Sequence, residues 1–555
     1  MALNVPGLIA TMVFYAAVLA TGIWASRKAK AKAKTGTFTE VALLAGRSIN
    51  LALGIFTMSA SWVGGGFILG IAEGVYSPDR GLVWTLYPVH FTVAFIAGGL
   101  ILAKPMREME CMTMLDPFER RYGKHMAALM AVVGIVAEIL GMAITLMALG
   151  GTMSTILDLP YVYSVVISAA VAIVYTLLGG LYSVAYTDVI QLVMIFVALW
   201  LCVPFIFLNP IPEDISHTAF NQTLRPSWLG HIETQDISRW VDDFIAQSLG
   251  MLGLQFFHQR VLSSASAATA QITCFAAAVI VLILGVPPVI IGAVAASTDW
   301  NLTTYGSPSP YERRESFGIL PICLQHLTPP FLSIVGIAAV AAAVMSSVDS
   351  SLIASASMFS SNIYRHIRKQ ASDREMQWVI RIAVLLTGVL GSTIALFAKT
   401  INGMWLLTAD VAYSILLPQL LCALFCPIAN GYGAAVGFVL GVLLRFLRGE
   451  PELGLPAVIY LGGASVPVRT LSALFTVACV LLVSYASEQL FRRRILPERW
   501  NVLGVSGVTS SSLPATLEGG SGGGDAGGGE MATMMMSASS KSCLDSEPEE
   551  KSTAF

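Results

Sequence analysis

Charged side chains are scarce in this chain of 555 residues, of which only 12% are Asp, Glu, Lys or Arg. A soluble protein carries roughly twice that share, about 25%. Hydrophobic residues make up 55% of the chain and its mean hydropathy is +0.73. This composition excludes a soluble globular protein and predicts an all-α polytopic membrane protein. The net charge of −2 gives no electrostatic reason to expect a nucleic-acid partner.

The chain also lacks the motifs of familiar catalytic and nucleotide-binding sites. It has no Walker loop, no HExxH and no G-x-S-x-G on a strand–helix turn. Its 8 cysteines are scattered and form neither a metal-binding cluster nor a disulfide framework. We therefore expect no enzymatic activity, and movement of a solute would have to draw on an ion gradient. The first apolar run has no basic segment before it, so we expect no cleavable signal peptide.

Apolar segments recur along the chain at lengths that can cross a bilayer, which takes about 20 residues per helix. They predict roughly thirteen spans, at 7–26, 47–75, 82–103, 123–155, 160–182, 186–208, 239–262, 269–293, 331–362, 378–399, 404–426, 431–448 and 470–490.

The positions of the basic residues predict the orientation. The run RKAKAKAK at 27–34 follows the first span, so the positive-inside rule places the N-terminus outside. The loops at 104–122, 260–268 and 363–377 then lie inside and carry most of the basic loop residues, Arg260 among them. The two N-x-[ST] sequons, at Asn221 and Asn301, fall on predicted outer loops and predict glycosylation there.

The composition changes near the end of the chain. Residues 1–495 are predicted to form the transmembrane transporter domain, and 496–555 a disordered Gly/Ser-rich cytoplasmic tail. The tail ends in Phe555, whose carboxylate and apolar side chain suit a PDZ-domain partner, although a random chain end is an equal alternative. Membrane lipids surround the spans, and homo-oligomerisation stays open.

Two predicted spans contain glycines that weaken a helix interior. In the first, MSASWVGGGFILG from Met58 to Gly70, three consecutive glycines follow Trp62, each costing about 1 kcal/mol relative to alanine. In the second, Gln247–Arg260, Gly250 and Gly253 fall at mid-membrane. Interrupted helices at corresponding positions of two halves are typical of inverted-repeat transporters with a midplane site. Close helix packing through small residues is the alternative.

A third segment, from Ala341 to Ser357, is rich in hydroxyl groups within a predicted span. Ser346 and Ser347 offer the oxygen ligands that a sodium ion takes, with backbone carbonyls of the first broken helix opposite. Asp349 is a carboxylate at membrane depth, which is costly and usually functional, so gating or ion coupling is expected of it. For Glu73, Glu138 and Asp410 we expect structural or gating roles. Packing of hydroxyls between helices is the alternative for the serines.

Several segments together resemble the sodium/solute symporter family and, within it, the branch that carries choline. They are TMSASWVGGGF, AKPMRE, TMLDPF, LLGGLYSVAYTDVIQL, HQRVLSS, STDWN, AAVMSSVDSS and ILLPQLLC, in this order. The resemblance extends from the N-terminus to about residue 495 and does not include the tail.

The resemblance implies a LeuT-like core of two inverted five-helix repeats, with one helix before it and two after. It places a sodium site on the backbone carbonyls of Ala60, Val63 and Ala343 and the hydroxyls of Ser346 and Ser347. It implies that chloride is required as well, without a ligand that we can assign. The glycan position of the family falls on Asn301, and the cargo is choline or a choline-like organic cation.

The resemblance also implies an aromatic cage around the trimethylammonium group of the cargo, held by cation–π attraction. The four cage positions fall on Trp62, Phe91, Gly141 and Leu254, so two aromatic walls are missing. Phe256 and Phe257 lie near Leu254, but helical spacing predicts that they point elsewhere. The cargo is therefore either choline, bound weakly, or a bulkier organic solute.

Other functions stay open at this point. A sugar or monocarboxylate cargo ranks lower, because the four cage positions offer neither a ring of hydrogen-bonding groups nor a cation. A membrane sensor that binds a solute and signals through its tail is a third possibility. Sodium-coupled uptake suits the plasma membrane, with cycling through intracellular vesicles as an alternative residence.

Overall fold

The structure is a computed structural model. It describes scattered residues between 9 and 24, then 38–157, 159–179, 181–220, 226–450, 454–458, 466–503 and 505. Half of the predicted span at 7–26 lies outside the described residues, as do Asn221 and the predicted tail from 506 onward.

Helices account for almost all regular structure in the described residues, where the only β pairing is three isolated bridges. In the first half of the chain the helices are α2 (Phe38–Leu44), η1 (Ala45–Arg47), α3 (Leu51–Trp62), α4 (Gly65–Tyr76), η2 (Leu82–Trp84), α5 (Tyr87–Ala97), η3 (Gly98–Leu102), α6 (Ala103–Glu108), α7 (Asp116–Tyr122), α8 (Lys124–Leu157), α9 (Tyr161–Gly179), α10 (Leu181–Phe207) and α11 (Ile215–Thr218).

The second half continues in the same way. Its helices are η4 (Thr234–Asp236), α12 (Ile237–Gly250), η5 (Met251–Gly253), α13 (Gln255–Ser263), α14 (Ala267–Ala296), η6 (Trp300–Leu302), η7 (Ser316–Gly318), α15 (Ile319–Leu327), α16 (Pro330–Met358), η8 (Phe359–Tyr364), α17 (Arg365–Ile367), α18 (Asp373–Phe397), α19 (Ile401–Val411), η9 (Ala412–Leu416), α20 (Leu417–Phe425), α21 (Gly431–Leu447), α22 (Val468–Arg492) and η11 (Glu498–Trp500).

Short polar side chains begin several of these helices. Asn50 accepts a hydrogen bond from the Leu53 amide at the start of α3, and Ser266 accepts one from Thr269 at the start of α14. Each such cap satisfies an amide that the first turn of a helix leaves unpaired. The boundaries between loops and spans are therefore set by local chemistry as well as by hydropathy.

Among the described residues, 8 helical runs are long and apolar enough to cross a membrane, and a ninth candidate is the bent pair α3–α4. The chain is thus a multi-pass, helical protein, as predicted. The difference from the predicted count has physical reasons. The apolar runs in α9 (Tyr161–Val174) and α21 (Gly431–Leu447) are shorter than 18 residues. Helices α12 and α13 are interrupted and rich in polar side chains, and only half of the first span is described.

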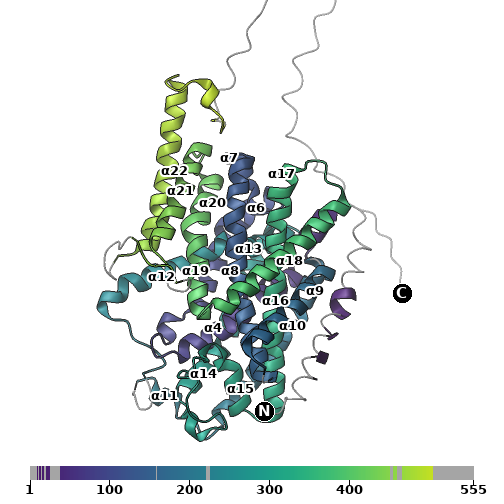
Figure 1. The fold of residues 1–555 in the computed structure, drawn as a ribbon, viewed down its shortest axis with the longest axis vertical. Coiled ribbons are helices and arrows are strands. Elements are labelled where there is room, and N and C mark those ends of the chain that lie inside the picture. The colour runs from purple at the N-terminus through teal and green to yellow at the C-terminus, as the bar shows by residue number, and fades with distance from the viewer. Residues whose placement is uncertain are drawn as a thin grey trace, which may run out of the picture. The chain divides into compact units, whose positions relative to one another are not determined.

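Helix α16 forms the centre of the bundle and packs against α8 and α10. In its most apolar stretch 78% of the residues are buried, compared with 33% for α22. Figure 1 shows α21 and α22 side by side at the edge of the bundle, with α7 and α17 near one end and α11, α14 and α15 near the other. The hydroxyl-rich segment of α16 therefore lies in the core.

Candidate functional site

The first glycine-rich span is broken, as the sequence predicts. Helix α3 ends at Trp62, Val63 has φ −82° and ψ 57°, and Gly64 is extended with φ −96° and ψ −170°. Helix α4 then begins at Gly65, and the two halves are bent by 46°. The Ser59 carbonyl accepts the Val63 amide at 2.8 Å, and because α3 stops here the carbonyls after it lack the helical amides that would follow.

The glycine at the break also allows α16 to approach. A Cβ atom built on Gly64 would lie 1.6 Å from the Ser347 hydroxyl oxygen and 3.6 Å from the Ala343 carbonyl oxygen. No larger residue fits there without moving the serine. The sequence analysis offered a helix break and close helix packing as alternative explanations of the glycines. At Gly64 both occur together.

The second predicted break is present too. Helix α12 ends at Gly250, a short turn of 3₁₀ helix follows, and Leu254 is extended with φ −103° and ψ 137° before α13 begins. A Cβ atom on Gly250 would lie 2.3 Å from the carbonyl oxygen of Ala409 in α19. Both interrupted spans are thus packed closely against other helices at their breaks.

Two of the predicted sodium ligands, Ala343 and Ser347 of α16, lie against the first break. The Ser347 hydroxyl donates to the Ser61 carbonyl at 3.3 Å, beside the buried Ala60 and Val63. The Ser346 hydroxyl donates to Asp188 at 2.5 Å. A hydroxyl that donates its proton keeps lone pairs for a cation. Backbone and hydroxyl oxygens are the ligands that hard cations prefer, so these residues fit a sodium ion.

Asp188 in α10 is a buried carboxylate that the sequence analysis did not select. It is 0% exposed and accepts hydrogen bonds from Ser346 and from Thr57 Oγ1, the latter at 2.5 Å. Arg260 Nη2 lies 3.7 Å from Asp188 Oδ2 and donates to the Ser350 hydroxyl at 2.6 Å. The sequence does contain a signal for Asp188, because a carboxylate inside an apolar span is rarely without function.

The placement of Arg260 in a cytoplasmic loop was wrong. Its side chain is in α13 and the residue is only 2% exposed. The positive-inside rule concerns arginines at the membrane surface, whereas this arginine is compensated inside the bundle by Asp188. Arg260 thus belongs to the polar network beside the predicted sodium ligands.

The other membrane-depth carboxylates also have partners. Asp349 Oδ1 accepts from Thr176 Oγ1 at 2.5 Å, and Glu73 accepts from the Asn402 amide at 2.9 Å. Asp410 lies 3.0 Å from Arg445 Nε and belongs to a cluster of buried ion pairs. Carboxylates that stabilise a helix bundle are expected to make contacts of this kind with side chains of other helices.

A small central cavity of about 30 Å³ lies at the first break. Its lining includes Trp62, Gly141 and Leu254, three of the four predicted cage positions. Phe91, the fourth, is not among the lining residues. It packs edge-on against Trp62 with 4.8 Å between ring centroids. A Cβ atom on Gly141 would have its nearest neighbour, Ser351 Oγ, at 4.0 Å, so space remains there.

Two aromatic residues that the sequence analysis did not assign line this cavity. The Phe256 ring lies 4.8 Å from the Trp62 ring, and Trp405 of α19 lines the cavity as well. The expectation that Phe256 points elsewhere was wrong, whereas Phe257 is not among the lining residues and packs edge-on against Trp62 with 6.2 Å between ring centroids. The indole nitrogens of Trp62 and Trp405 have no hydrogen-bond partner among the described residues. The cavity is thus lined by aromatic residues, two of which have unpaired indole N–H groups.

Glu138 of α8 places a carboxyl group on the lining of the same cavity. It is 1% exposed, lines the cavity, and its Oε1 accepts the backbone N–H of Phe256 at 3.0 Å. This bond attaches the start of α13 to α8. A buried carboxylate beside aromatic faces is an environment that attracts organic cations.

Membrane-length helices, two interrupted spans and a midplane cavity beside a cluster of oxygen ligands together define a secondary transporter. Comparison with family models agrees with this class. The chain belongs to the sodium:solute symporter family, whose model matches residues 43–441. The substrates of this family cross membranes with sodium.

The chain is similar to individual proteins over most of its length. It is 44% identical over 513 residues to the human "High affinity choline transporter 1", which covers 90% of this chain and 88% of that protein. Identity to the Caenorhabditis elegans "High-affinity choline transporter 1" is 41% over 515 residues, with the same two coverages. The fold is shared with a Na⁺-coupled sialic acid symporter in its outward-open state, at a TM-score of 0.69 and 17% identity, over 87% of this chain and 97% of that one.

Proposed function

We propose that this protein imports choline or a choline-like organic cation together with sodium, by alternating access. The observation that carries the proposal is the cavity at the first break, where Trp62, Phe256 and Trp405 surround a space that Glu138 also lines. The relatives reported above are named for choline transport, which supports the same cargo. We expect no enzymatic activity.

The lining groups match the chemistry of choline. A quaternary ammonium cannot donate hydrogen bonds, so it is held by aromatic faces, each worth roughly 0.5–2 kcal/mol, and by a nearby negative charge. Phe256 and Trp405 replace the walls that Gly141 and Leu254 do not supply. The unpaired indole N–H groups of Trp62 and Trp405 are donors for the choline hydroxyl.

Sodium binding at the break would couple the ion gradient to the cargo. The ligands we propose are the carbonyls of Ala60, Val63 and Ala343 with the hydroxyls of Ser346 and Ser347. Ser61 and Trp62 follow Ala60 directly, so an ion that fixes this turn also fixes one wall of the cavity. Asp349 is proposed to contribute to gating or ion coupling through α16, and chloride is proposed as a further requirement.

The cavity is too small for the proposed cargo in this structure. A volume of about 30 Å³ holds a water molecule or two but not an organic cation. Uptake therefore requires opening of the helices around the break, as in other transporters that gate a midplane site.

The rest of the predicted architecture is part of this proposal. It comprises thirteen spans with two inverted five-helix repeats, an N-terminus outside, a C-terminus inside, and a transporter domain at 1–495 with a tail at 496–555. We propose residence at the plasma membrane, with cycling through intracellular vesicles. Asn301 is an exposed residue of η6, which supports glycosylation there, and Asn221 is the second proposed position. A PDZ partner at Phe555 and a homo-oligomer are further proposals.

Uptake of labelled choline tests the function directly. Cells that express the protein should take up choline in sodium, and replacing sodium by N-methylglucamine should abolish this uptake. Trp62→Ala removes the central ring and should raise the half-saturating choline concentration by about two- to thirtyfold, the effect of losing one cation–π contact. Trp62→Phe, which keeps an aromatic face, is the matched control. Absence of sodium-dependent uptake in the wild-type protein would contradict the proposal.

A bulkier cargo is the second candidate, because space remains beside Gly141. Running the same assay with larger quaternary amines and neutral solutes distinguishes the two. If a larger amine is taken up and choline is not, Gly141→Trp with Leu254→Trp should shift the preference toward choline. If neither the wild type nor this double variant moves choline, the choline assignment is wrong.

A further inference from the structure

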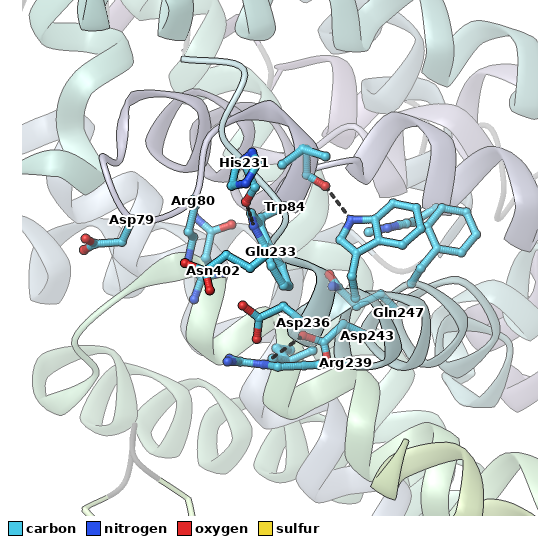
Figure 2. Close-up of a pocket in the computed structure, with 15 residues that line it drawn as sticks. Asp79, Arg80, Trp84, His231, Glu233, Asp236, Arg239, Asp243, Gln247 and Asn402 are labelled. Carbon is cyan, nitrogen blue, oxygen red and sulfur yellow. Dashed lines mark hydrogen bonds and ion pairs between the residues drawn. The ribbon is translucent and has the colours of Figure 1, made fainter. Parts of the chain in front are cut away.

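A second and larger cavity lies away from the central one. It has a volume of about 450 Å³ and is lined by residues of α12, of the α4–α5 connection and of α19. The two cavities share no lining residue. Helix α19 separates them, since Asn402 and Leu406 line the larger cavity and Trp405 and Thr408 the central one. The loop at 209–238 is predicted to lie outside, so we name this space the outer cavity (Figure 2).

Carboxylates outnumber cationic side chains in the lining of the outer cavity. Four acidic residues line it, compared with the guanidinium groups of Arg80 and Arg239. Figure 2 shows Asp236, Asp243 and Arg239 gathered on one side of it. Asp243 pairs with Arg469, whereas Asp236 has no ion-pair partner among residues 226–450 and the other described segments. The lining therefore favours a cationic ligand.

An aromatic face in the outer cavity already binds a cation of the protein. The Arg239 guanidinium carbon lies 5.8 Å from the centre of the Trp84 ring, within cation–π range. The Trp84 indole is held in place because its Nε1 donates to the His231 carbonyl at 3.0 Å. The Arg239 side chain is 58% exposed, and its Nε is 4.0 Å from Asp243. The Arg239 guanidinium is thus weakly held and can be displaced from the Trp84 ring.

Two buried polar atoms on the lining have no partner among the described residues. They are His90 Nδ1 and Gln247 Oε1, in residues that are 3% and 7% exposed. Gln247 Oε1 is an acceptor only, so its natural partner is an N–H or O–H group. Leaving such an atom buried and unpaired is costly, which indicates that a polar ligand or water contacts it.

We propose that the outer cavity is a second binding site for a hydroxyl-bearing organic cation. The cation displaces Arg239 from the Trp84 face and lies near Asp236, and its hydroxyl donates to Gln247. The site holds the cargo outside α19 while the central cavity is closed. The identity of the cation rests on the proposed function, but the site itself rests on the groups that line the outer cavity.

Equilibrium binding of labelled choline to the purified full-length protein tests this site. Measured in sodium-free buffer, binding should persist, since no proposed sodium ligand lines the outer cavity. Trp84→Ala and Asp236→Asn should each weaken this binding, Trp84→Ala by about two- to thirtyfold. Arg239→Gln should strengthen it, because it removes the competing cation. Trp84→Phe, which keeps a ring, should retain most of the affinity and controls for folding.

The same measurement separates this site from the central one. Trp62→Ala should leave sodium-free binding unchanged and reduce only the additional binding that sodium induces. With tetramethylammonium as the probe, Gln247→Leu should have little effect, whereas it should weaken binding of choline. Absence of sodium-free binding, or loss of it in Trp62→Ala but not in Trp84→Ala, would overturn the outer site. Absence of the sodium-induced component alone would instead count against the proposed function.

Discussion

Gly64→Ala is expected to abolish sodium-dependent uptake, whereas Gly141→Ala should leave it almost unchanged. The added methyl group at Gly64 would lie 1.6 Å from Ser347 Oγ, so the serine and α16 must move away from the break. Overpacking of this kind costs about 1–3 kcal/mol and displaces a proposed sodium ligand as well. At Gly141 the same methyl group has its nearest neighbour at 4.0 Å and fits without strain.

Initial rates of choline uptake against sodium concentration measure this effect, after normalisation to the amount of protein at the cell surface. We expect Gly64→Ala to show no sodium-dependent uptake at any sodium concentration tested. A Gly64→Ala variant with a normal sodium dependence would mean that the contact between Ser347 and the break is not part of the ion site.

Asp188→Asn is expected to have the second large effect. It removes the ion-pair partner of the buried Arg260 guanidinium, and breaking a buried ion pair in this way costs about 3–5 kcal/mol. It also weakens the acceptor of the Ser346 and Thr57 hydroxyls. The variant should therefore melt at a lower temperature in detergent and should lose sodium-dependent uptake.

The double variant Asp188→Asn with Arg260→Gln separates stability from function. Removing both charges eliminates the unpaired arginine, so much of the lost thermal stability should return. Sodium-dependent uptake should not return, because the carboxylate that orients Ser346 is still absent. If the single variant is as stable as the wild type, the ion pair has no structural role.

The sequence predicted those features of the fold that depend on local backbone chemistry. The breaks at Gly64 and at Gly250–Gly253 were predictable because glycine weakens a helix and membranes tolerate interruptions only inside protein. The serine-rich segment of α16 was predictable as a site because hydroxyl groups are unusual in so apolar a stretch. All of these signals lie within short runs of the chain.

The arrangement of side chains across helices could not be predicted in the same way. The orientation of Phe256 was mistaken because helical spacing was carried through Leu254, where the chain is extended and α13 starts with a new phase. Arg260 was mistaken for a loop residue because its partner, Asp188, is on a different helix. Trp405 lies in an ordinary apolar span, and only the packing of α19 brings it to the central cavity.

Accumulation of labelled choline in proteoliposomes tests the central claim most directly. With an inward sodium gradient imposed on the purified protein, choline should accumulate inside above its external concentration. Accumulation should collapse when a sodium ionophore dissipates the gradient, and Ser347→Ala should strongly reduce it. Equal choline uptake with and without the sodium gradient would contradict the claim that an ion at the broken helix is coupled to an organic cation beside Trp62.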